Sequence, residues 1–436
     1  MATKALLDHN PNPDDQEIKK ALEHNLCRCT GYLRIIDAVK LAGQFIRGET
    51  TPDAVRPDPN GPKIGVSHPR PSSMLKACGL AEFSADIKLQ NALEVAVHRS
   101  TEHHAMITSI DTSVAEKMPG VVGVMTARDI KGTNRIKIVY GDQPILAEDK
   151  VYCLGDSVAI VVANTREQAL AAAAAVKVAY EPLPVLKTPE QAMSPDAIQL
   201  HSERPNLCFR QPQIRGDAEK ALAESAAVVE GHFSTQCNHQ APLEPEATIA
   251  YIEGDGEDAQ LVVVGRSINI HLHMSNLQEA LGYENIRYEE AFSGGNFGQK
   301  LAMTSEAVSG AAALHFRRPV RYIPSLAESM LMSSKRHPFN MKVKLGASAD
   351  GKLTAFDIDF IVDNGAYQIN GMVIVKRALW MLSGSYYIPN INALARLVYT
   401  NNPAGGAARG AGPPQVTFAL ESAIDMLAEK LDIDPL

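Results

Sequence analysis

The sequence lacks the features that mark membrane, secreted and nucleic-acid-binding proteins. It has no run of about 18 or more apolar residues, so we expect no transmembrane helix and no membrane partner. Residues 1–20 contain no long apolar stretch of the kind found in secretory signal peptides, so we expect a cytoplasmic protein. Acidic residues exceed basic ones, 50 to 42, and the formal charge of −8 argues against nucleic acid as a partner.

Cysteine is also scarce, since six cysteines in 436 residues are too few for a disulfide scaffold. Four stand alone in the sequence and are expected to be small buried side chains: Cys78, Cys153, Cys208 and Cys237. The other two, Cys27 and Cys29, are separated by one residue, which is too short for a comfortable disulfide. Two thiolates at this spacing suit one metal centre, although two unrelated cysteines in a turn would give the same pattern.

The length predicts two to four domains, at roughly 150 residues each. Residues 1–48 are expected to form two short helices, one beginning near Asn12–Asp14 and one after Thr30-Gly31. Residues 49–63 are rich in Pro, Asp and Gly and are expected to be a linker. The remainder alternates strand and helix patterns and is divided into segments 64–187 and 188–436. The whole chain is therefore predicted to have a multi-domain α+β fold.

Within these two segments, apolar runs and alternation predict individual elements. In the first segment, strands are expected at 92–98, 120–126 and 157–163. An Ala-rich helix with Thr165 as its N-cap is expected to run to about Val178. In the second, strands are expected at 247–252, 261–265 and 285–290, a hairpin at 340–362 around Asp350-Gly351, and helices at 303–316 and 415–431.

Two loops could bring the backbone close to a bulky ligand. Residues 294–300 contain two glycines, an aromatic residue and a further glycine; a plain turn is the alternative. Residues 408–415 place Arg409 among small residues before a proline-started helix, where its planar donor fork could face an anionic or carbonyl oxygen. A surface arginine on a flexible turn is the alternative. His271 and His273 alternate on an expected strand, where a channel lining or a buried core pair is favoured over metal ligands.

The octet at residues 25–32 and an ordered series of other motifs resemble the xanthine oxidase family of molybdenum hydroxylases. Within that family, the sequence is most similar to the FAD-independent aldehyde oxidoreductases. The motifs span essentially the whole chain and lie at residues 4–8, 10–13, 27–32, 67–71, 144–146, 150–151, 243–245, 267–273, 294–300, 304–307, 409–412 and 426–431. The resemblance implies a fragment of the all-α iron–sulfur domain at 1–48, an α/β hammerhead-like domain at 64–187 and the first molybdenum-cofactor-binding α/β domain at 188–436, with the second absent.

The resemblance also assigns site residues. Cys27 and Cys29 would ligate a [2Fe–2S] cluster. The cofactor would be contacted by Asn238, Gly295, Phe297, Gly298 and Arg409, with the backbone N–H groups of Phe297 and Gly298 facing an oxygen on the molybdenum. Arg377 and Ala411 would lie on the substrate side. A buried ion pair is the alternative for Arg377, Asn238 stands where relatives often have glutamine, and Ala411 stands where they usually have an aromatic residue, which implies a roomier pocket.

The implied activity is oxidation of an aldehyde to a carboxylic acid with oxygen derived from water. The implied cofactors are molybdopterin in its cytosine dinucleotide form with molybdenum, and [2Fe–2S], without FAD because only a linker stands where single-chain xanthine dehydrogenases place an FAD domain. Electrons would leave through the clusters to a ferredoxin- or flavodoxin-like acceptor. The alternatives are a purine or N-heterocycle hydroxylase of the same family, and a non-catalytic remnant. Carbon monoxide oxidation is disfavoured, because those relatives place a cysteine where Gly410 stands.

Parts of the family's machinery are missing from this sequence. The family's C-x-x-C cluster ligands and its Gly-x-Gly-Glu segment, which holds the catalytic glutamate base, do not occur in the matching places. We therefore name no catalytic residue. We expect either a second chain that supplies the missing domains or a homo-oligomer as the partner, and we expect the isolated chain to be inactive.

Overall fold

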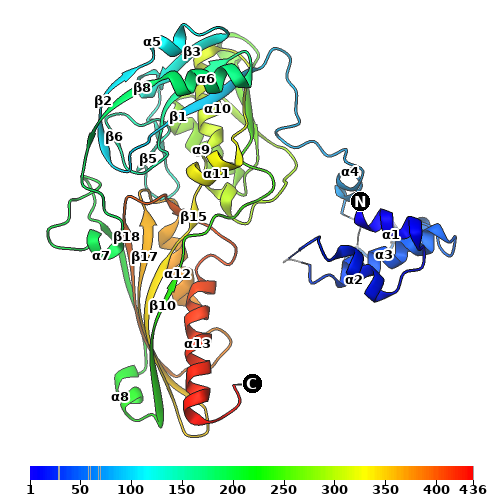
Figure 1. The fold of residues 1–436 in the computed structure, drawn as a ribbon, viewed down its shortest axis with the longest axis vertical. Helices are drawn as coiled ribbons and strands as arrows, with labels where there is room; N and C mark the ends of the chain where they lie inside the picture. The colour runs from blue at the N-terminus through cyan, green and yellow to red at the C-terminus, as the bar shows by residue number, and fades with distance from the viewer. Residues whose placement is uncertain (28–29, 57, 59, 67, 69, 436) are drawn as a thin grey trace. The chain divides into compact units, whose positions relative to one another are not determined.

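The computed structural model describes residues 1–27, 30–56, 58, 60–66, 68 and 70–435 (Figure 1). Contacts divide the chain into two units, Met1–Ala81 and Glu82–Leu436. In the described part of the chain, no helix is long and apolar enough to cross a membrane. Each unit has its own core.

The first unit is helical. It contains α1 (Ala2–His9), α2 (Asp15–Leu22), α3 (Leu33–Ile46), the short 3-10 helix η1 (Asp53–Val55) and α4 (Ser73–Ala77). The Asp14 carboxylate caps α2 by accepting from the backbone N–H groups of Gln16 and Glu17. The two expected helices are α2 and α3. The additional α1 buries only Leu7, so it leaves no apolar stripe in the sequence.

The second unit contains a seven-stranded sheet in the order β13-β12-β11-β14-β1-β7-β3. Its strands are β1 (Leu93–Arg99), β3 (Val121–Thr126), β7 (Ser157–Ala163), β11 (Thr248–Glu253), β12 (Gln260–Gly265), β13 (Ile286–Glu290) and β14 (Val320–Tyr322). β1 and β14 pair in parallel, with Leu93 opposite Val320. One sheet therefore includes strands from both sides of residue 187.

Helices pack on both faces of this sheet. α10 (Ser305–Phe316) packs on β11, β12 and β14, and α9 (Ile270–Leu281) packs on α10. On the other face, α6 (Arg166–Ala175) packs alanines against Ala159 and Val161 of β7. Burial on both faces explains why β7 is an almost unbroken apolar run rather than an alternating one.

The expectation for the end of the Ala-rich helix is wrong. α6 ends at Ala175, and β8 (Lys177–Pro182) follows and pairs with β2 (Ala105–Asp111), which also pairs with β6 (Lys150–Val151). The alanine run carries no local stop signal. Pairing with a strand some seventy residues earlier ends the helix, and this contact is not visible in a local pattern.

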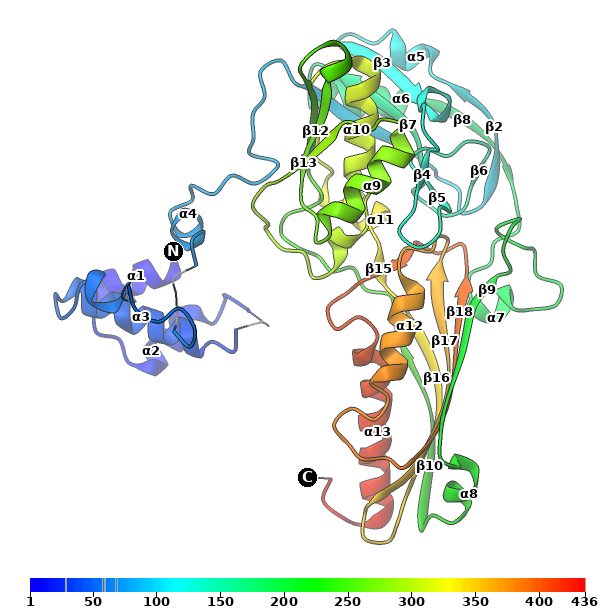
Figure 2. The same ribbon diagram turned by 180° about the vertical axis from the view of Figure 1, so that it is seen from behind.

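A second, five-stranded sheet has the order β10-β16-β17-β18-β9. Its strands are β9 (Leu207–Arg215), β10 (Ala227–Thr235), β16 (Phe339–Ala347), β17 (Leu353–Gly365) and β18 (Asn390–Tyr399). The expected hairpin is confirmed as β16 and β17, with Gly351 at φ 81° in the turn. α12 (Gly371–Trp380) and α13 (Pro413–Leu431) lie side by side along one face of this sheet (Figure 2).

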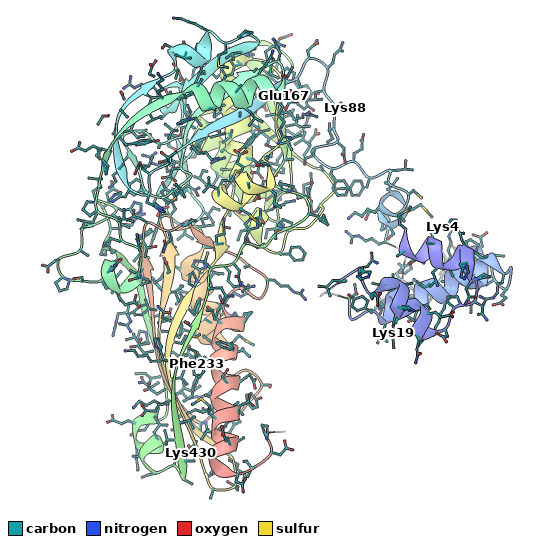
Figure 3. The ribbon with its side chains drawn as sticks, in the orientation of Figure 1. Lys4, Lys19, Lys88, Glu167, Phe233 and Lys430 are labelled. Atoms are coloured by element: carbon teal, nitrogen blue, oxygen red, sulfur yellow. The ribbon has the colours of Figure 1, made fainter. Side chains whose placement is uncertain are left out.

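The long helix α13 is anchored to the edge strand β10. The Phe233 ring packs edge-on against Phe418 with centroids 5.9 Å apart, and the Lys430 ammonium donates to the Val228 carbonyl over 2.7 Å. Figure 3 shows Phe233 and Lys430 at two levels of this contact. α13 begins at Pro413, two residues before the expected start at 415, because both prolines fit the first turn of the helix.

The remaining elements of the second unit are short. They are α5 (Ser113–Glu116), η2 (Ala127–Asp129), β4 (Arg135–Ile136), β5 (Gln143–Pro144), α7 (Pro189–Ala192), α8 (Ala218–Ala223), η3 (Gly256–Asp258), η4 (Gln299–Leu301), α11 (Leu326–Met332), β15 (Lys335–Arg336) and β19 (Gly405–Gly406). β15 and β19 pair in parallel. This small pair bears directly on the candidate site.

The expectation that His271 and His273 lie on a strand is wrong, because both lie on α9, where residues two apart face different ways. His271 is exposed. His273 is buried, with Nε2 3.0 Å from the Leu301 carbonyl and Nδ1 3.5 Å from Glu306 Oε1. Burial opposes charge on both groups, but their pairing outweighs it: the pKa of His273 is raised and the pKa of Glu306 is lowered.

These shifts make the stability of the protein depend on pH. The raised pKa of His273 adds stability that is complete below the usual pKa of histidine and is lost as pH rises through the shifted value; the lowered pKa of Glu306 adds stability that is lost at acidic pH. We therefore expect His273→Gln to lower the melting temperature most between about pH 5 and 6 and less above about pH 8. His271→Gln, at the exposed neighbour, should leave the profile unchanged. If His273→Gln lowered the melting temperature more at alkaline than at acidic pH, the result would contradict this pairing.

Candidate functional site

Segments far apart in the sequence meet at an open pocket of about 350 Å³. It is lined by Asn238, His239, Gln240, Phe297, Arg336, Ala408 and Arg409. Backbone hydrogen bonds join the segments: the Arg336 N–H donates to the Asn238 carbonyl over 2.9 Å, and the Arg409 N–H donates to the Phe297 carbonyl over 2.9 Å. The pocket is therefore built by main-chain pairing rather than by side chains alone.

The loop at residues 294–300 depends on its glycines. Gly295 and Gly298 have φ of 119° and 101°, which favour glycine, and a Cβ on Gly298 would lie 2.6 Å from the Ala407 carbonyl oxygen. Phe297 is itself left-handed, at φ 52°; the residue is 42% exposed and lines the pocket. Such a conformation in a bulky residue is strained and is commonly found at functional sites.

Two side chains hold this loop from behind. Asn296 Oδ1 accepts from the backbone N–H groups of Gly298 and Lys300, over 3.0 and 3.1 Å. Glu244 Oε2 accepts from the Gly294 N–H over 2.7 Å and pairs with the Lys300 ammonium at 2.5 Å. The Lys300 side chain is only 2% exposed. The Gly298 N–H, expected to face an oxygen of the cofactor, thus already has a partner within the chain.

Two arginines, Arg336 and Arg409, make the lining of the pocket basic. One guanidinium nitrogen of Arg336, NH2, donates to the Arg409 carbonyl over 2.7 Å, whereas the other, NH1, is buried without a hydrogen-bond partner. Burial lowers the pKa of Arg336. Gln240 Nε2 donates to the Ala407 carbonyl over 2.6 Å, and Gln240 Oε1 is buried without a partner. Unpaired buried polar atoms beside arginines fit an anionic ligand with a polar edge, as a phosphorylated pterin is.

Lys335, which precedes Arg336 in β15, carries another positive group. The buried Lys335 ammonium donates to the Ser333 carbonyl and lies 3.4 Å from the Ser333 hydroxyl, and burial lowers the pKa of Lys335 to about 8. The Ser333 hydroxyl also lies 2.9 Å from His239 Nε2. Because His239 Nδ1 accepts from the Ala241 N–H, Nε2 carries the ring proton and donates to Ser333. The surroundings of the pocket therefore favour negative charge in it.

The structure brings together only part of the predicted set. Asn238, Phe297 and Arg409 line the pocket, with Gly295 and Gly298 in the loop that carries Phe297. Ala411, at φ 51°, is half-buried and packs against the core under α12 and α13. Arg377 is exposed on α12 and is not among the described residues that line the pocket, so the alternative of a buried ion pair is wrong.

The cysteine expectations have mixed outcomes. The Cys27 N–H donates to the Tyr32 hydroxyl over 2.6 Å, in the turn before α3, whereas Cys29 lies outside the described residues. Cys153 is buried and Cys208 half-buried, but Cys78 and Cys237 are exposed, which corrects the expectation for those two. Among the described residues, no group of three or more His, Cys, Asp or Glu is placed to hold a metal ion.

Gln240 and Arg336 were missed by sequence reasoning. Gln240 lies two residues after Asn238, so an extended segment places both on one side. That spacing was a usable signal. The sequence contains no comparable signal for Arg336, because its place in the pocket results from the pairing of β15 with residues 238 and 405–406.

Comparison with known protein families assigns the residues that line the pocket to a cofactor-binding domain. Residues 200–436 match the molybdopterin cofactor-binding domain. Residues 78–184 match the a/b hammerhead domain of aldehyde oxidase and xanthine dehydrogenase, and residues 1–40 match the [2Fe-2S] binding domain. The predicted architecture of an iron–sulfur fragment, a hammerhead domain and a cofactor-binding domain is confirmed.

Individual oxidoreductases and dehydrogenases are also similar to this chain. Aldehyde oxidoreductase from Megalodesulfovibrio gigas is 37% identical over the full chain, which covers 50% of that protein. The nicotinate dehydrogenase large molybdopterin subunit of Eubacterium barkeri is 35% identical, with 86% of this chain and 87% of that protein covered. A solved structure of the Desulfovibrio gigas aldehyde oxidoreductase superposes with a TM-score of 0.90 at 36% identity, covering all of this chain and 50% of the other.

The chain thus spans about half the length of the aldehyde oxidoreductases that it matches. Its two sheets, the strained loop around Phe297 and three successive family matches all agree on one assignment. The chain belongs to the xanthine oxidase family of molybdenum hydroxylases.

Proposed function

We propose that this chain is part of a molybdenum-dependent aldehyde oxidoreductase, which oxidises aldehydes to carboxylic acids and passes the electrons through [2Fe–2S] clusters. The observation that carries the proposal is the pocket in which Asn238, Phe297 and Arg409 meet, although they lie far apart in the sequence. The similarity to aldehyde oxidoreductases along the whole chain supports the same activity.

The residues of the pocket have distinct roles in this proposal. When bound, the molybdenum cofactor supplies the two-electron oxidation and the oxygen derived from water. Arg336 and Arg409 bind its anionic and carbonyl oxygens, and the Phe297 ring walls the pocket against water. Glu244 and Lys300 hold the loop that carries Phe297. Cys27 and Cys29 ligate a [2Fe–2S] cluster in the first unit.

Finer features belong to the same proposal. The cofactor is the cytosine dinucleotide form of molybdopterin. No FAD is used in this proposal, which is supported by the linker-like composition of residues 49–63, where single-chain xanthine dehydrogenases place an FAD domain. Arg377 and Ala411 lie on the substrate side, outside the pocket that Phe297 and Arg409 line, and the small Ala411 leaves room for the substrate there. The electron acceptor is a ferredoxin- or flavodoxin-like protein, and the enzyme works in the cytoplasm.

Activity requires the polypeptide that corresponds to the other half of the aldehyde oxidoreductases. One relative is named as a large molybdopterin subunit and is covered over 87% of its length, so in that enzyme a region of this extent is a subunit of its own. Expressed by itself, the chain should contain negligible molybdenum and show no aldehyde-dependent dye reduction. Produced together with the missing half, it should contain iron and molybdenum and reduce the dye. Stoichiometric molybdenum in the isolated chain would contradict this requirement.

N-heterocycle hydroxylation is the second candidate function, favoured by the similarity to the nicotinate dehydrogenase subunit. The complete enzyme separates the two candidates when acetaldehyde, nicotinate and xanthine are compared as substrates. Faster turnover of acetaldehyde supports the first candidate. Faster turnover of either heterocycle supports the second.

A further inference from the structure

The orientation of the Gln240 amide is determined by its neighbour. The Ala407 carbonyl lies 2.6 Å from Gln240 Nε2 and, as an oxygen that can only accept, it requires the amide nitrogen on its side. Gln240 Oε1 therefore faces the other way, where it is buried and has no hydrogen-bond partner. A buried amide oxygen in this state is an acceptor that lacks its donor.

Arg336, in the same pocket, has a donor that lacks an acceptor. Its NH2 is anchored on the Arg409 carbonyl, 2.7 Å away, and its NH1 is buried without a partner. Gln240 and Arg336 are both fixed to backbone carbonyls within residues 407–409, and both line the pocket. An unsatisfied acceptor and an unsatisfied donor are thus held on one short stretch of main chain.

A ligand that satisfies both atoms must offer a donor and an acceptor together. Leaving buried polar atoms unpaired is costly, so such a ligand gains the hydrogen bonds and removes the penalty at once. An amide edge of a planar ring, with N–H next to C=O, offers this pair, and the exposed ring of Phe297 provides a face for stacking in the same pocket.

We propose that Gln240 and Arg336 recognise the amide edge of a planar ring in this pocket, with Gln240 Oε1 accepting from the ring N–H and Arg336 donating to the ring carbonyl. The inference rests on the proposed function and deepens it. Two sources carry this chemistry: the pterin of the cofactor and the lactam of a heterocyclic substrate. A simple aldehyde has no N–H and is not recognised by the pair.

Binding of two probes to the full chain tests the inference. Pterin-6-carboxylate represents the cofactor and xanthine the heterocyclic substrate; binding is measured by fluorescence and calorimetry. Gln240→Met and Arg336→Met should each weaken binding of one of these probes at least about tenfold, the effect of one hydrogen bond to a buried partner. The exposed Gln236 and Arg210 supply the controls Gln236→Met and Arg210→Met, which should bind as the unaltered chain does.

A change in the probe tests the pair without altering the protein. 2,4-Diaminopteridine-6-carboxylate replaces the ring carbonyl by an amino group and loses the neighbouring ring N–H. It should therefore bind the unaltered chain at least about tenfold more weakly than pterin-6-carboxylate, and neither Gln240→Met nor Arg336→Met should add a further loss. The probe that responds to the variants identifies the source of the ring.

Equal binding by the variants and the unaltered chain, or no binding of either ring, would overturn the inference. These results leave the proposed function standing if the complete enzyme still contains molybdenum and oxidises aldehyde. A complete enzyme without molybdenum would overturn the proposed function, whatever the binding experiment shows.

Discussion

Replacing Lys300 by methionine should destabilise the second unit by about 3–5 kcal/mol, because the change leaves the Glu244 carboxylate buried without its cationic partner. The two side chains are 2% and 10% exposed, and their charged atoms are 2.5 Å apart. The same carboxylate oxygen accepts from the Gly294 N–H, so the loop that carries Phe297 should loosen at the same time. Urea unfolding monitored by circular dichroism measures the loss.

Another ion pair in the chain provides the matched control. Lys344 and Glu230 are 2.6 Å apart but 50% and 64% exposed, so Lys344→Met should cost less than about 1 kcal/mol. Combining Lys300→Met with Glu244→Leu should restore part of the lost stability, since no isolated charge remains. Equal losses for the two lysines would show that burial does not set the energy of the Glu244 pair.

The second large effect is expected from Gly298→Ala. An alanine at this position must adopt φ near 101°, and its Cβ would lie 2.6 Å from the Ala407 carbonyl oxygen. The loop or residues 407–409 must therefore move. Since Ala407 also holds Gln240, the displacement should reach both walls of the pocket. We expect the free energy of unfolding to fall by about 3 kcal/mol, measured by urea unfolding. We also expect the complete enzyme to lose most of its molybdenum, measured by metal analysis.

A matched variant at Gly256 separates the effect of backbone strain from the effect of the steric clash. Gly256 has φ 61°, and a Cβ there would meet nothing within 4 Å. Gly256→Ala should therefore cost only about 1 kcal/mol and leave the molybdenum content unchanged. A Gly298→Ala enzyme with full molybdenum would rule out close approach of residues 298 and 407 as a requirement of the site.

Local patterns predicted the elements whose signals are complete within a few residues. The β16–β17 hairpin has a turn signal at Asp350-Gly351 and was found where expected. α13 has two prolines at its start and was found within two residues of the expected start. α9 and α12 were not predicted. α9 follows a short turn after β12 and buries His273 and Asn276 beside apolar residues, so its apolar stripe is interrupted.

The candidate site was predicted in outline, because the glycine loop and Arg409 are sequence motifs whose chemistry is local. The placement of Gln240, Arg336 and Arg377 was beyond the reach of pattern reasoning. Arg336 lines the pocket because β15 pairs with β19 and with Asn238. Arg377 lies outside the pocket because it is on the exposed side of α12. Each result depends on which segments pair across long sequence separations.

Amino-acid order alone specified the family, the strand and helix runs with clear endings, and the glycines that a left-handed loop requires. Packing specified the single sheet that crosses residue 187, the end of α6 at Ala175, and the unpaired atoms of Gln240 and Arg336. The difference is physical. Backbone conformation depends mainly on neighbouring residues, whereas burial and hydrogen-bond partners depend on contacts between residues that the chain brings together only on folding.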